Sequence, residues 1–333
     1  MREPSFWWRK PGLTAALLAP LGALYGAVAA RRMARPGRRA GVPVICVGNL
    51  TLGGSGKTPA AIMVARDLQA QGARPVFLTR GYGGRLGGPV MVASTHTAAE
   101  VGDEPLLLAR VAPTIVARDR VAGAAAAEAA GAEIIVMDDG FQNPALAKSV
   151  SIVVIDGRRG IGNGCVFPAG PLRAPLAAQL APGPLLLVIG EVGGSAEAVR
   201  NAAAGRGVMT GRLVPDPAAM AALAGRRTLA YAGIGDPEKF FATLRTAGIA
   251  VEETRSFADH HVLTAAEAAE LIARADERRL TLVTTEKDLA RMTGDDALAT
   301  LAARTMTLPV TLSIDDATPL AGLLARGRLF GRE

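Results

Sequence analysis

Cysteine, histidine and aromatic residues are all scarce in this chain of 333 residues. It has 2 cysteines and 3 histidines, and aromatic residues make up 4% of the sequence. Two cysteines cannot build a disulfide framework or a cysteine-rich zinc site, and three histidines leave little room for histidine-based metal chemistry. Half of the residues are hydrophobic. The core must therefore consist mainly of alanine, valine, leucine and isoleucine, which suits an α/β fold.

Acidic residues are almost absent from the first 40 positions. Glu3 is the only acid there, and the eight bases are Arg2, Arg9, Lys10, Arg31, Arg32, Arg35, Arg38 and Arg39. This segment alone accounts for the net charge of +7, so residues 41–333 sum to zero. The basic charge belongs to one end of the chain. It does not indicate a nucleic-acid-binding surface, and we expect no nucleic-acid partner.

The basic end surrounds an uncharged run at 11–30, PGLTAALLAPLGALYGAVAA. A signal peptide, a membrane-spanning helix and a helix lying in the membrane interface are the three interpretations. Pro20 and the bases on both sides favour the interfacial helix, with Trp7, Trp8 and Tyr25 near the headgroups and arginines on anionic lipid. We therefore expect a membrane surface as a partner of this end.

A glycine-rich turn in the stretch 44–59, VICVGNLTLGGSGKTP, carries the strongest functional signal. A β-branched strand precedes it and a helix starting at Pro59 follows it, which is the context of a phosphate-binding loop. Backbone N–H groups of such a turn converge on an anion, and the helix N-terminus adds partial positive charge. Lys57 can reach the β- and γ-phosphates of a nucleotide, and the Thr58 hydroxyl can bind Mg²⁺. The predicted nucleotide-binding residues are Thr51, Leu52, Gly53, Gly54, Ser55, Gly56, Lys57 and Thr58.

The alternative is a surface turn whose lysine and threonine are merely exposed. The strand before it and the proline-started helix after it favour the nucleotide site. One position departs from the general pattern, since Thr51 stands where a glycine is usual. We expect ATP and Mg²⁺ as ligands.

Three later segments carry candidate polar groups. The apolar strand 134–137 ends at Asp138, which is typical of the acid on the Mg²⁺ side of a phosphate-loop enzyme. The irregular loop 156–175 contains Arg173, which suits an anionic head group. Asp103 and Glu104 open a helix, where acids are typical of capping.

These segments together resemble the tetraacyldisaccharide 4′-kinase family, the inner-membrane lipid A enzymes of Gram-negative bacteria. The resemblance covers nearly the whole chain. It rests on VGNLTLGGSGKTP at 47–59, TRGYGGR at 79–85, VGDEP at 101–105, DDGFQ at 138–142, PAGPLR at 168–173, FADHH at 257–261 and TTEKD at 284–288. The family also lacks glycine at the place of Thr51. Ala174 is a departure, because the family usually has glutamate there.

The resemblance implies phosphoryl transfer from ATP to the 4′-hydroxyl of a tetraacyldisaccharide 1-phosphate, which gives lipid IVA and ADP. It implies that Asp103 is the base and that His260 orients it as a dyad. It also implies that the metal and head-group region is lined by Asp139, Glu104, Arg120, Gln142 and Arg173, with Lys57 and Asp139 among the catalytic residues. Spacing alone does not indicate the base role of Asp103.

We expect a P-loop NTPase-like α/β/α domain with a mostly parallel sheet, a smaller second α/β/α domain and an N-terminal membrane-associated helix. The expected boundaries are 1–40 for the anchor helix, 41–210 for the kinase domain, 211–315 for the second domain and 316–333 for a C-terminal helix. We expect a monomer at the cytoplasmic face of the bacterial inner membrane. The alternative function is a membrane-associated P-loop ATPase or GTPase switch, although 285–288, Thr-Glu-Lys-Asp, lacks the spacing of a guanine-reading motif.

Overall fold

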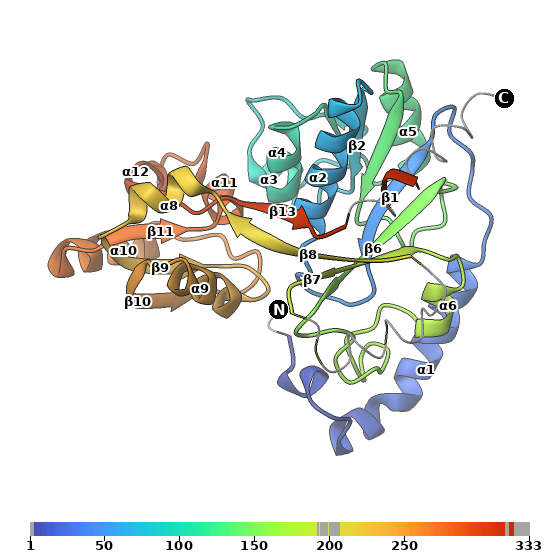
Figure 1. Ribbon diagram of the computed structural model, residues 1–333, viewed down its shortest axis with the longest axis horizontal. Coiled ribbons are helices and arrows are strands. Elements are labelled where there is room, and N and C mark those ends of the chain that lie inside the picture. Colours follow the sequence, from blue (N-terminus) through green and yellow to red (C-terminus); the bar gives the residue numbers. More distant parts are fainter. Residues whose placement is uncertain (1–2, 192, 194–198, 200–206, 317–319, 323–333) are drawn as a thin grey trace.

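The computed structural model describes residues 3–191, 193, 199, 207–316 and 320–322. Two sheets organise these residues, the larger one on the right of Figure 1 and the smaller one on the left. The larger sheet has the strand order β13 (Val310–Ile314), β8 (Val208–Pro215), β7 (Leu185–Ile189), β6 (Val150–Asp156), β1 (Val44–Asn49), β5 (Ile134–Asp138), β2 (Pro75–Thr79), β4 (Thr114–Val116) and β3 (Val90–Met91).

The larger sheet is parallel from β8 to β4, and only the edge strands β13 and β3 run antiparallel to their neighbours. Helices α2 (Lys57–Ala70) and α4 (Asp103–Ala109) pack on one face, while α5 (Arg120–Ala129) and α6 (Leu176–Leu180) pack on the other. The short α3 (Ala98–Val101) precedes α4. This is the expected α/β/α layering with a mostly parallel sheet.

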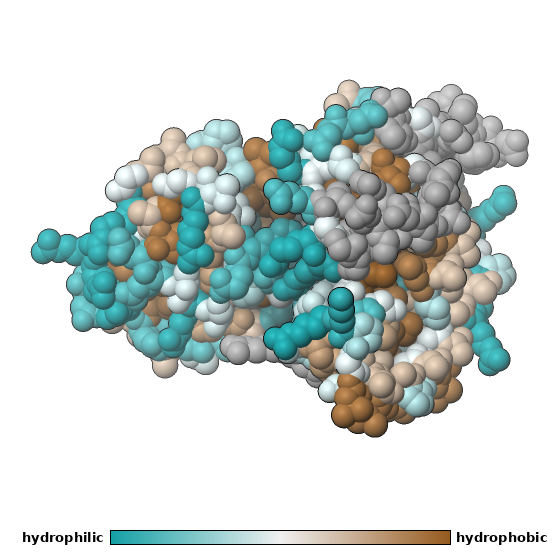
Figure 2. All heavy atoms as spheres, turned by 60° about the horizontal axis from the view of Figure 1, so that its bottom comes forward, coloured by the Kyte–Doolittle hydropathy of each residue, from teal (hydrophilic) through white to brown (hydrophobic). Residues whose placement is uncertain are grey.

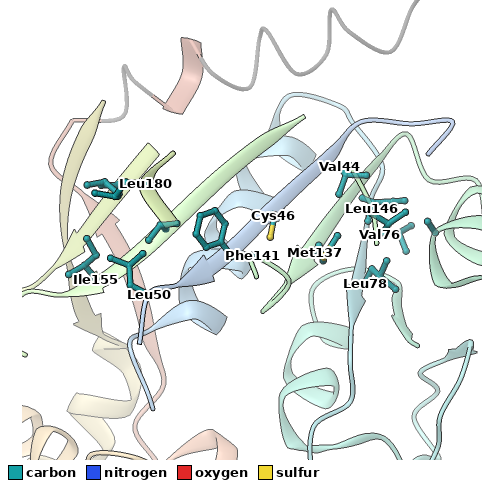
Figure 3. Packing of buried hydrophobic residues seen from close by; sticks show 14 of the residues in the cluster. Val44, Cys46, Leu50, Val76, Leu78, Met137, Phe141, Leu146, Ile155 and Leu180 are labelled. Atoms are coloured by element: carbon teal, nitrogen blue, oxygen red, sulfur yellow. The ribbon is translucent and has the colours of Figure 1, made fainter. Parts of the chain in front are cut away.

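Strand β1 lies in the middle of the larger sheet and is buried along its whole length. Its neighbour β5 pairs with it so that Val47 is opposite Asp138. Parallel strands place their carboxyl ends at one edge of a sheet, which is where ligands bind in α/β folds. Below that edge, Phe141 packs with Cys46 and Leu50 in one core cluster (Figure 3). The turn after β1 and the acids after β5 are therefore held side by side.

The smaller sheet is also parallel and has the order β10 (Ala250–Ser256), β9 (Arg227–Ala232), β11 (Thr281–Thr284) and β12 (Thr305–Thr307). Helices cover both of its faces: α8 (Pro217–Leu223) and α9 (Pro237–Thr246) lie on one side, and α10 (Ala265–Arg278), α11 (Glu286–Met292) and α12 (Ala299–Arg304) on the other. The expected second α/β/α unit is present.

The boundaries drawn from the sequence do not coincide with the two sheets. Strand β8 runs through the expected boundary at 210/211, and β13 pairs with β8 in the larger sheet although it was expected in the second unit. The chain leaves the larger sheet after β8, builds the smaller one and returns as β13. Of the expected C-terminal helix, only 320–322 lie within the described residues, and Leu320 is buried in the core of the larger sheet.

The N-terminal segment contains a 3-10 helix, η1 (Ser5–Trp8), and the long helix α1 (Leu13–Met33) at the lower right of Figure 1. Gly22 lies directly against the loop before α6, because a Cβ added there would come within 2.8 Å of the Val166 carbonyl oxygen. The opposite side of α1 bears a stripe of exposed side chains, Leu13, Leu17, Leu21, Leu24 and Val28. Figure 2 shows hydrophobic side chains gathered over this part of the molecule.

The two tryptophans of this segment contact the rest of the protein. Trp7 is buried, and its indole N–H donates to the Pro168 carbonyl oxygen at 3.1 Å, because a buried indole needs an acceptor for its N–H. Trp8 lies beneath the guanidinium of Arg159, 4.7 Å from it, and donates its indole N–H to Glu3. These contacts with Pro168 and Arg159 anchor η1 to the loop before α6. The headgroup position expected for the tryptophans stays a prediction.

Candidate active site

The turn between β1 and α2 has the backbone of an anion-binding loop. Gly56 caps α2 with a φ of 87°, a left-handed conformation that favours glycine, and Lys57 and Thr58 open the helix as buried residues. The first N–H groups of a helix have no partner within it, so they are available to an anion. The predicted nucleotide-binding residues 51–58 thus form one continuous turn at the carboxyl edge of the larger sheet.

Arg173 connects this turn to the acidic end of β5. Its Nε donates to the Thr51 carbonyl oxygen at 2.9 Å, and its two terminal nitrogens bind Asp139 at 2.8 and 3.2 Å. Lys57 approaches the same carboxylate, with 3.8 Å between Nζ and Oδ2. Arg173 was expected to bind a head group, but here its three donor nitrogens hold the phosphate loop and Asp139 together.

Asp139 is held in an unusual state. Its φ of 52° is left-handed, which is uncommon for a residue other than glycine and is found disproportionately at functional sites. Burial alone would raise the pKa of this carboxyl, but Lys57 and Arg173 outweigh it and lower the pKa to about 2. Asp139 is therefore ionised and balances the two cations beside the phosphate loop.

Asp138 is the opposite case, because no described side chain bonds it and the charges of Lys57 and Lys287 do not outweigh its burial. It is completely buried at the end of β5, and neither of its carboxylate oxygens has a hydrogen-bond partner among the described residues. Burial, with the charges of Glu104 and Asp139, raises its pKa well above the usual range. A buried carboxylate without a partner is costly unless a cation neutralises it. Asp138 and the Thr58 hydroxyl are therefore a donor set that fits Mg²⁺.

Asp103 and His260 meet across the two sheets. Asp103 opens α4, and His260 lies in the loop between β10 and α10, with 3.3 Å between Nδ1 of the histidine and Oδ2 of the aspartate. Oδ1 of Asp103 accepts the N–H of the adjacent Glu104 at 2.9 Å, but the N-cap of α4 is Gly102 and no side chain caps the helix. Asp103 is an acid in the first turn, and the expected capping bond is absent. Its Oδ2 faces the histidine. His260 has a left-handed φ of 56°.

Arg291 completes this contact, and sequence reasoning missed it. It lies in α11, is 6% exposed, and its Nε donates to Asp103 Oδ2 at 2.8 Å. Its Nη1 bonds the Gly233 carbonyl and Asp288, each at 2.7 Å. Although burial would raise the pKa of Asp103, His260, Arg291 and Lys287 hold it well below its usual range. Arg291 follows the TTEKD motif by one helical turn, and nothing local marks it as a partner of Asp103.

Glu104 follows Asp103 in α4 and contacts helix α11 of the second unit. Lys287 Nζ donates to Glu104 Oε1 at 2.5 Å. Burial would raise the pKa of Glu104, but the charges of Lys287 and Lys57 lower it. The carboxylate therefore lies within the electrostatic reach of both the phosphate loop and α11, where the resemblance expected a substrate residue.

A cavity of about 370 Å³ opens beside Asp103, His260 and Arg291. Its walls come from both units: the loop after β2, helix α3 and the end of α11. Tyr82 lies on this wall with its ring 4.9 Å from that of His260. Tyr82 and Gly83, from the motif at 79–85, therefore line this cavity.

Two other expected substrate residues are engaged within the fold. Arg120 is 3% exposed and donates to the Ala117 carbonyl oxygen at 2.6 Å, and burial lowers its pKa. Gln142 donates its amide hydrogens to the Asn49 carbonyl oxygen and to Gln179 at 2.6 and 2.8 Å. Their substrate roles stay predictions.

Ala174, the departure from the family pattern, is fully buried immediately after Arg173. Its carbonyl oxygen accepts a hydrogen bond of 2.7 Å from the buried amide of Gln179. No carboxylate stands at this position. The acids near the phosphate loop include Asp138 at the end of β5, Asp139 directly after it, and Glu3, whose carboxylate lies against Gly53.

A phosphate loop on the central strand of a parallel sheet, with acids at the end of the neighbouring strand, defines a P-loop enzyme of the nucleotide-dependent kind. Residues 14–327 match the family model described as tetraacyldisaccharide-1-P 4′-kinase. The chain therefore belongs to the tetraacyldisaccharide-1-P 4′-kinase family, as the sequence motifs suggested.

Relatives and a solved structure agree with this assignment. The chain is 58% identical to the tetraacyldisaccharide 4′-kinase of Methylobacterium sp. (strain 4-46), over 98% of this chain and 99% of that one. It is 54% identical to the enzyme of the same name from Rhodopseudomonas palustris (strain BisB5), over 100% of both chains. The crystal structure of "apo" form LpxK from Aquifex aeolicus in complex with ATP matches with a TM-score of 0.71 at 25% identity, over 95% of this chain and 99% of that chain.

We expect Asp138→Asn to stabilise the protein when nucleotide and metal are absent. The substitution removes a buried charge without a partner, which should raise the free energy of unfolding at pH 8 by about 1–3 kcal/mol. Urea unfolding measures this. Asp139→Asn is the matched control and should lower stability, because it breaks the contacts with Arg173 and Lys57. An equal loss in both variants would contradict the contrast between the two acids.

Proposed function

We propose that this protein transfers the γ-phosphoryl group of ATP to the 4′-hydroxyl of a tetraacyldisaccharide 1-phosphate, giving lipid IVA and ADP. The observation that carries the proposal is the contact of Asp103 with His260 and Arg291, at a cavity whose walls come from both units. Transfer to an alcohol needs a positioned acceptor for the hydroxyl proton and neutralisation of the phosphate charge. Asp103 can accept the proton, and Lys57 of the phosphate loop lies within electrostatic reach of Glu104, the neighbour of Asp103.

Residues 51–58 bind the phosphates of ATP, with Lys57 reaching the β- and γ-phosphates. Thr58 and Asp138 would hold Mg²⁺, which supplies charge neutralisation to the phosphate oxygens. The support for this is the match between a buried carboxylate that has no described partner and the hydroxyl at the start of α2. Asp139 keeps Lys57 and Arg173 in place around the loop.

Asp103 accepts the proton of the 4′-hydroxyl, and His260 orients it. Its low pKa makes Asp103 a weak base that is fully ionised at neutral pH. A weak base is sufficient if the transition state is loose, because the attacking hydroxyl then gains little charge before the phosphoryl group arrives. The main work of the dyad is to hold the hydroxyl in line.

Glu104, Arg120, Gln142 and Arg173 surround the metal and head-group region. Arg173 and Gln142 already donate to groups of the protein, so direct contact with substrate would require them to exchange those hydrogen bonds. Tyr82 lines the cavity beside Asp103 and His260.

A lipid substrate accounts for the N-terminal helix. By length and composition α1 is long and apolar enough to cross a membrane, and its outward stripe is 57–78% exposed. Arg31 and Arg32 lie in its last turn, and the basic residues 35, 38 and 39 follow it, where anionic lipid would attract them. We propose that α1 holds the cleft at headgroup depth on the cytoplasmic face of the inner membrane, where ATP is present.

The experiment that tests the function is transfer of labelled γ-phosphate from Mg-ATP to tetraacyldisaccharide 1-phosphate in mixed micelles. Wild type should form product, and Asp103→Ala and His260→Ala should each lower kcat by about 10²–10⁴-fold, the range of general acid–base groups.

His261→Ala is the matched control, because the neighbouring histidine contacts Glu267 at 3.0 Å instead of Asp103. It should keep activity within about twofold. ATP hydrolysis without lipid product would contradict the kinase and favour a switch ATPase. Equal losses in the 260 and 261 variants would contradict the dyad.

The role of α1 is tested by replacing Leu17, Leu21 and Leu24 with glutamine. These side chains are 72%, 57% and 67% exposed, so the change should spare the fold. Binding to vesicles containing anionic phospholipid should weaken by at least about tenfold, since each leucine contributes about 1.5–3 kcal/mol when buried in lipid. Sedimentation with vesicles measures it, and activity on detergent-dispersed substrate is the control. Unchanged vesicle binding would refute the anchor.

A further inference from the structure

The phosphate loop is held from behind by side-chain amides. A loop whose N–H groups converge on an anion must turn its carbonyl oxygens the other way, and buried carbonyls need donors. Asn49 is fully buried, and its Nδ2 donates to the Thr51 carbonyl oxygen at 2.7 Å and to that of Gly53 at 3.4 Å. Arg173 Nε supplies a second donor to Thr51 at 2.9 Å.

Two glutamines extend this support from other elements. Gln142, which follows β5, donates to the Asn49 carbonyl oxygen at 2.6 Å. Gln179, in α6, is 0% exposed and donates to the carbonyl oxygens of Leu50 and Ala174 at 3.2 and 2.7 Å. Its own amide oxygen accepts from Gln142 at 2.8 Å. The carbonyl oxygens of residues 49, 50, 51 and 53 therefore all accept from side chains of this group.

We propose that Gln179 is a positioning residue for ATP, acting through Gln142 and the backbone of the phosphate loop. Gln179 fixes the amide of Gln142, and the two together hold the carbonyl groups of Asn49 and Leu50 away from the phosphates. The inference rests on the proposed use of ATP. It gives Gln142 a task inside the protein, in place of the substrate contact expected for it.

The hydrogen bonds of the Gln179 amide indicate a defined role for this side chain. A fully buried glutamine is rare unless all its polar atoms are bonded, and each polar atom of the Gln179 amide has a partner here. Removing the amide leaves the buried Ala174 carbonyl without its side-chain donor and takes one of two donors from the Leu50 carbonyl, which also accepts the Arg173 backbone N–H at 2.9 Å. This loss favours a loop that rotates these groups toward other partners. Rotation of those peptide groups would move their N–H groups away from the phosphates. The affinity for ATP should therefore fall more than kcat.

The test compares Gln179→Met, Gln142→Met and the double variant, since methionine is similar in size but has no amide. ATP affinity is measured by calorimetry, and KM for ATP, KM for the lipid and kcat by phosphoryl transfer. Both single variants should raise Kd and KM for ATP about tenfold, with KM for the lipid within about twofold. The double variant should resemble either single one, because the two amides act in series.

Gln69→Met is the control, because the exposed amide of Gln69 on α2 bonds the Val111 carbonyl away from the loop. It should leave ATP affinity unchanged. Thermal unfolding without nucleotide shows whether Gln179→Met is folded. If it is not, Gln179→Glu is used in its place. That variant keeps an acceptor for Gln142 but loses the donor to Leu50 and Ala174, and it should also weaken ATP binding.

Three results would overturn the inference. The first is ATP affinity within twofold of wild type in a folded Gln179 variant. The second is a Gln142→Met variant that raises KM for the lipid and not for ATP, which would restore the substrate role of Gln142. The third is full additivity of the two changes. A wild-type protein that does not bind ATP would instead refute the proposed function itself.

Discussion

The ion pair between Asp103 and Arg291 is the interaction on which the site depends. Asp103 belongs to the unit that carries the phosphate loop, and Arg291 belongs to the unit built on the smaller sheet. Both side chains are almost fully buried, and removing one partner of such a pair leaves a charge uncompensated, which is strongly destabilising. His260 joins the same carboxylate from the same side. The cavity beside them exists in this form only while the two units are in contact.

Pairing of acids with cations accounts for most of the other charged side chains in the site. Asp139 is balanced by Lys57 and Arg173, Glu104 by Lys287, and Asp103 by Arg291. Asp138 is the buried acid of this group for which the described residues provide no partner. The described side chains therefore neutralise Asp103, Glu104 and Asp139 and leave Asp138 without a hydrogen-bond partner, which supports our proposal that a cation binds there. Such a site lowers stability until it is filled, as is common for functional sites.

Local chemistry allowed much of this to be predicted from the sequence. Short-range patterns predict the strand, the glycine turn and the helix at 44–70, and they also predict Asp138 at the end of β5. These residues form the proposed nucleotide side of the site. The contact of Asp103 with His260 could be predicted only from resemblance, because Asp103 lies in the first turn of a helix, where acids are common. Arg291 and Gln179 could not be predicted, since each bonds a distant part of the chain: Arg291 contacts Asp103 and Gln179 contacts Leu50, more than a hundred residues away in both cases. The same limit applies to β13, whose residues show a strand but not which sheet it joins.

The most direct test of the account is a double-mutant cycle on Asp103→Asn and Arg291→Met, measured as kcat/KM for phosphoryl transfer to the lipid. If the site is assembled across the two units through this pair, the losses should be strongly non-additive, with the double variant close to Asp103→Asn alone. Additive losses would mean that Arg291 acts independently of Asp103. That result would contradict the central claim that the second unit completes the active site by holding the carboxylate.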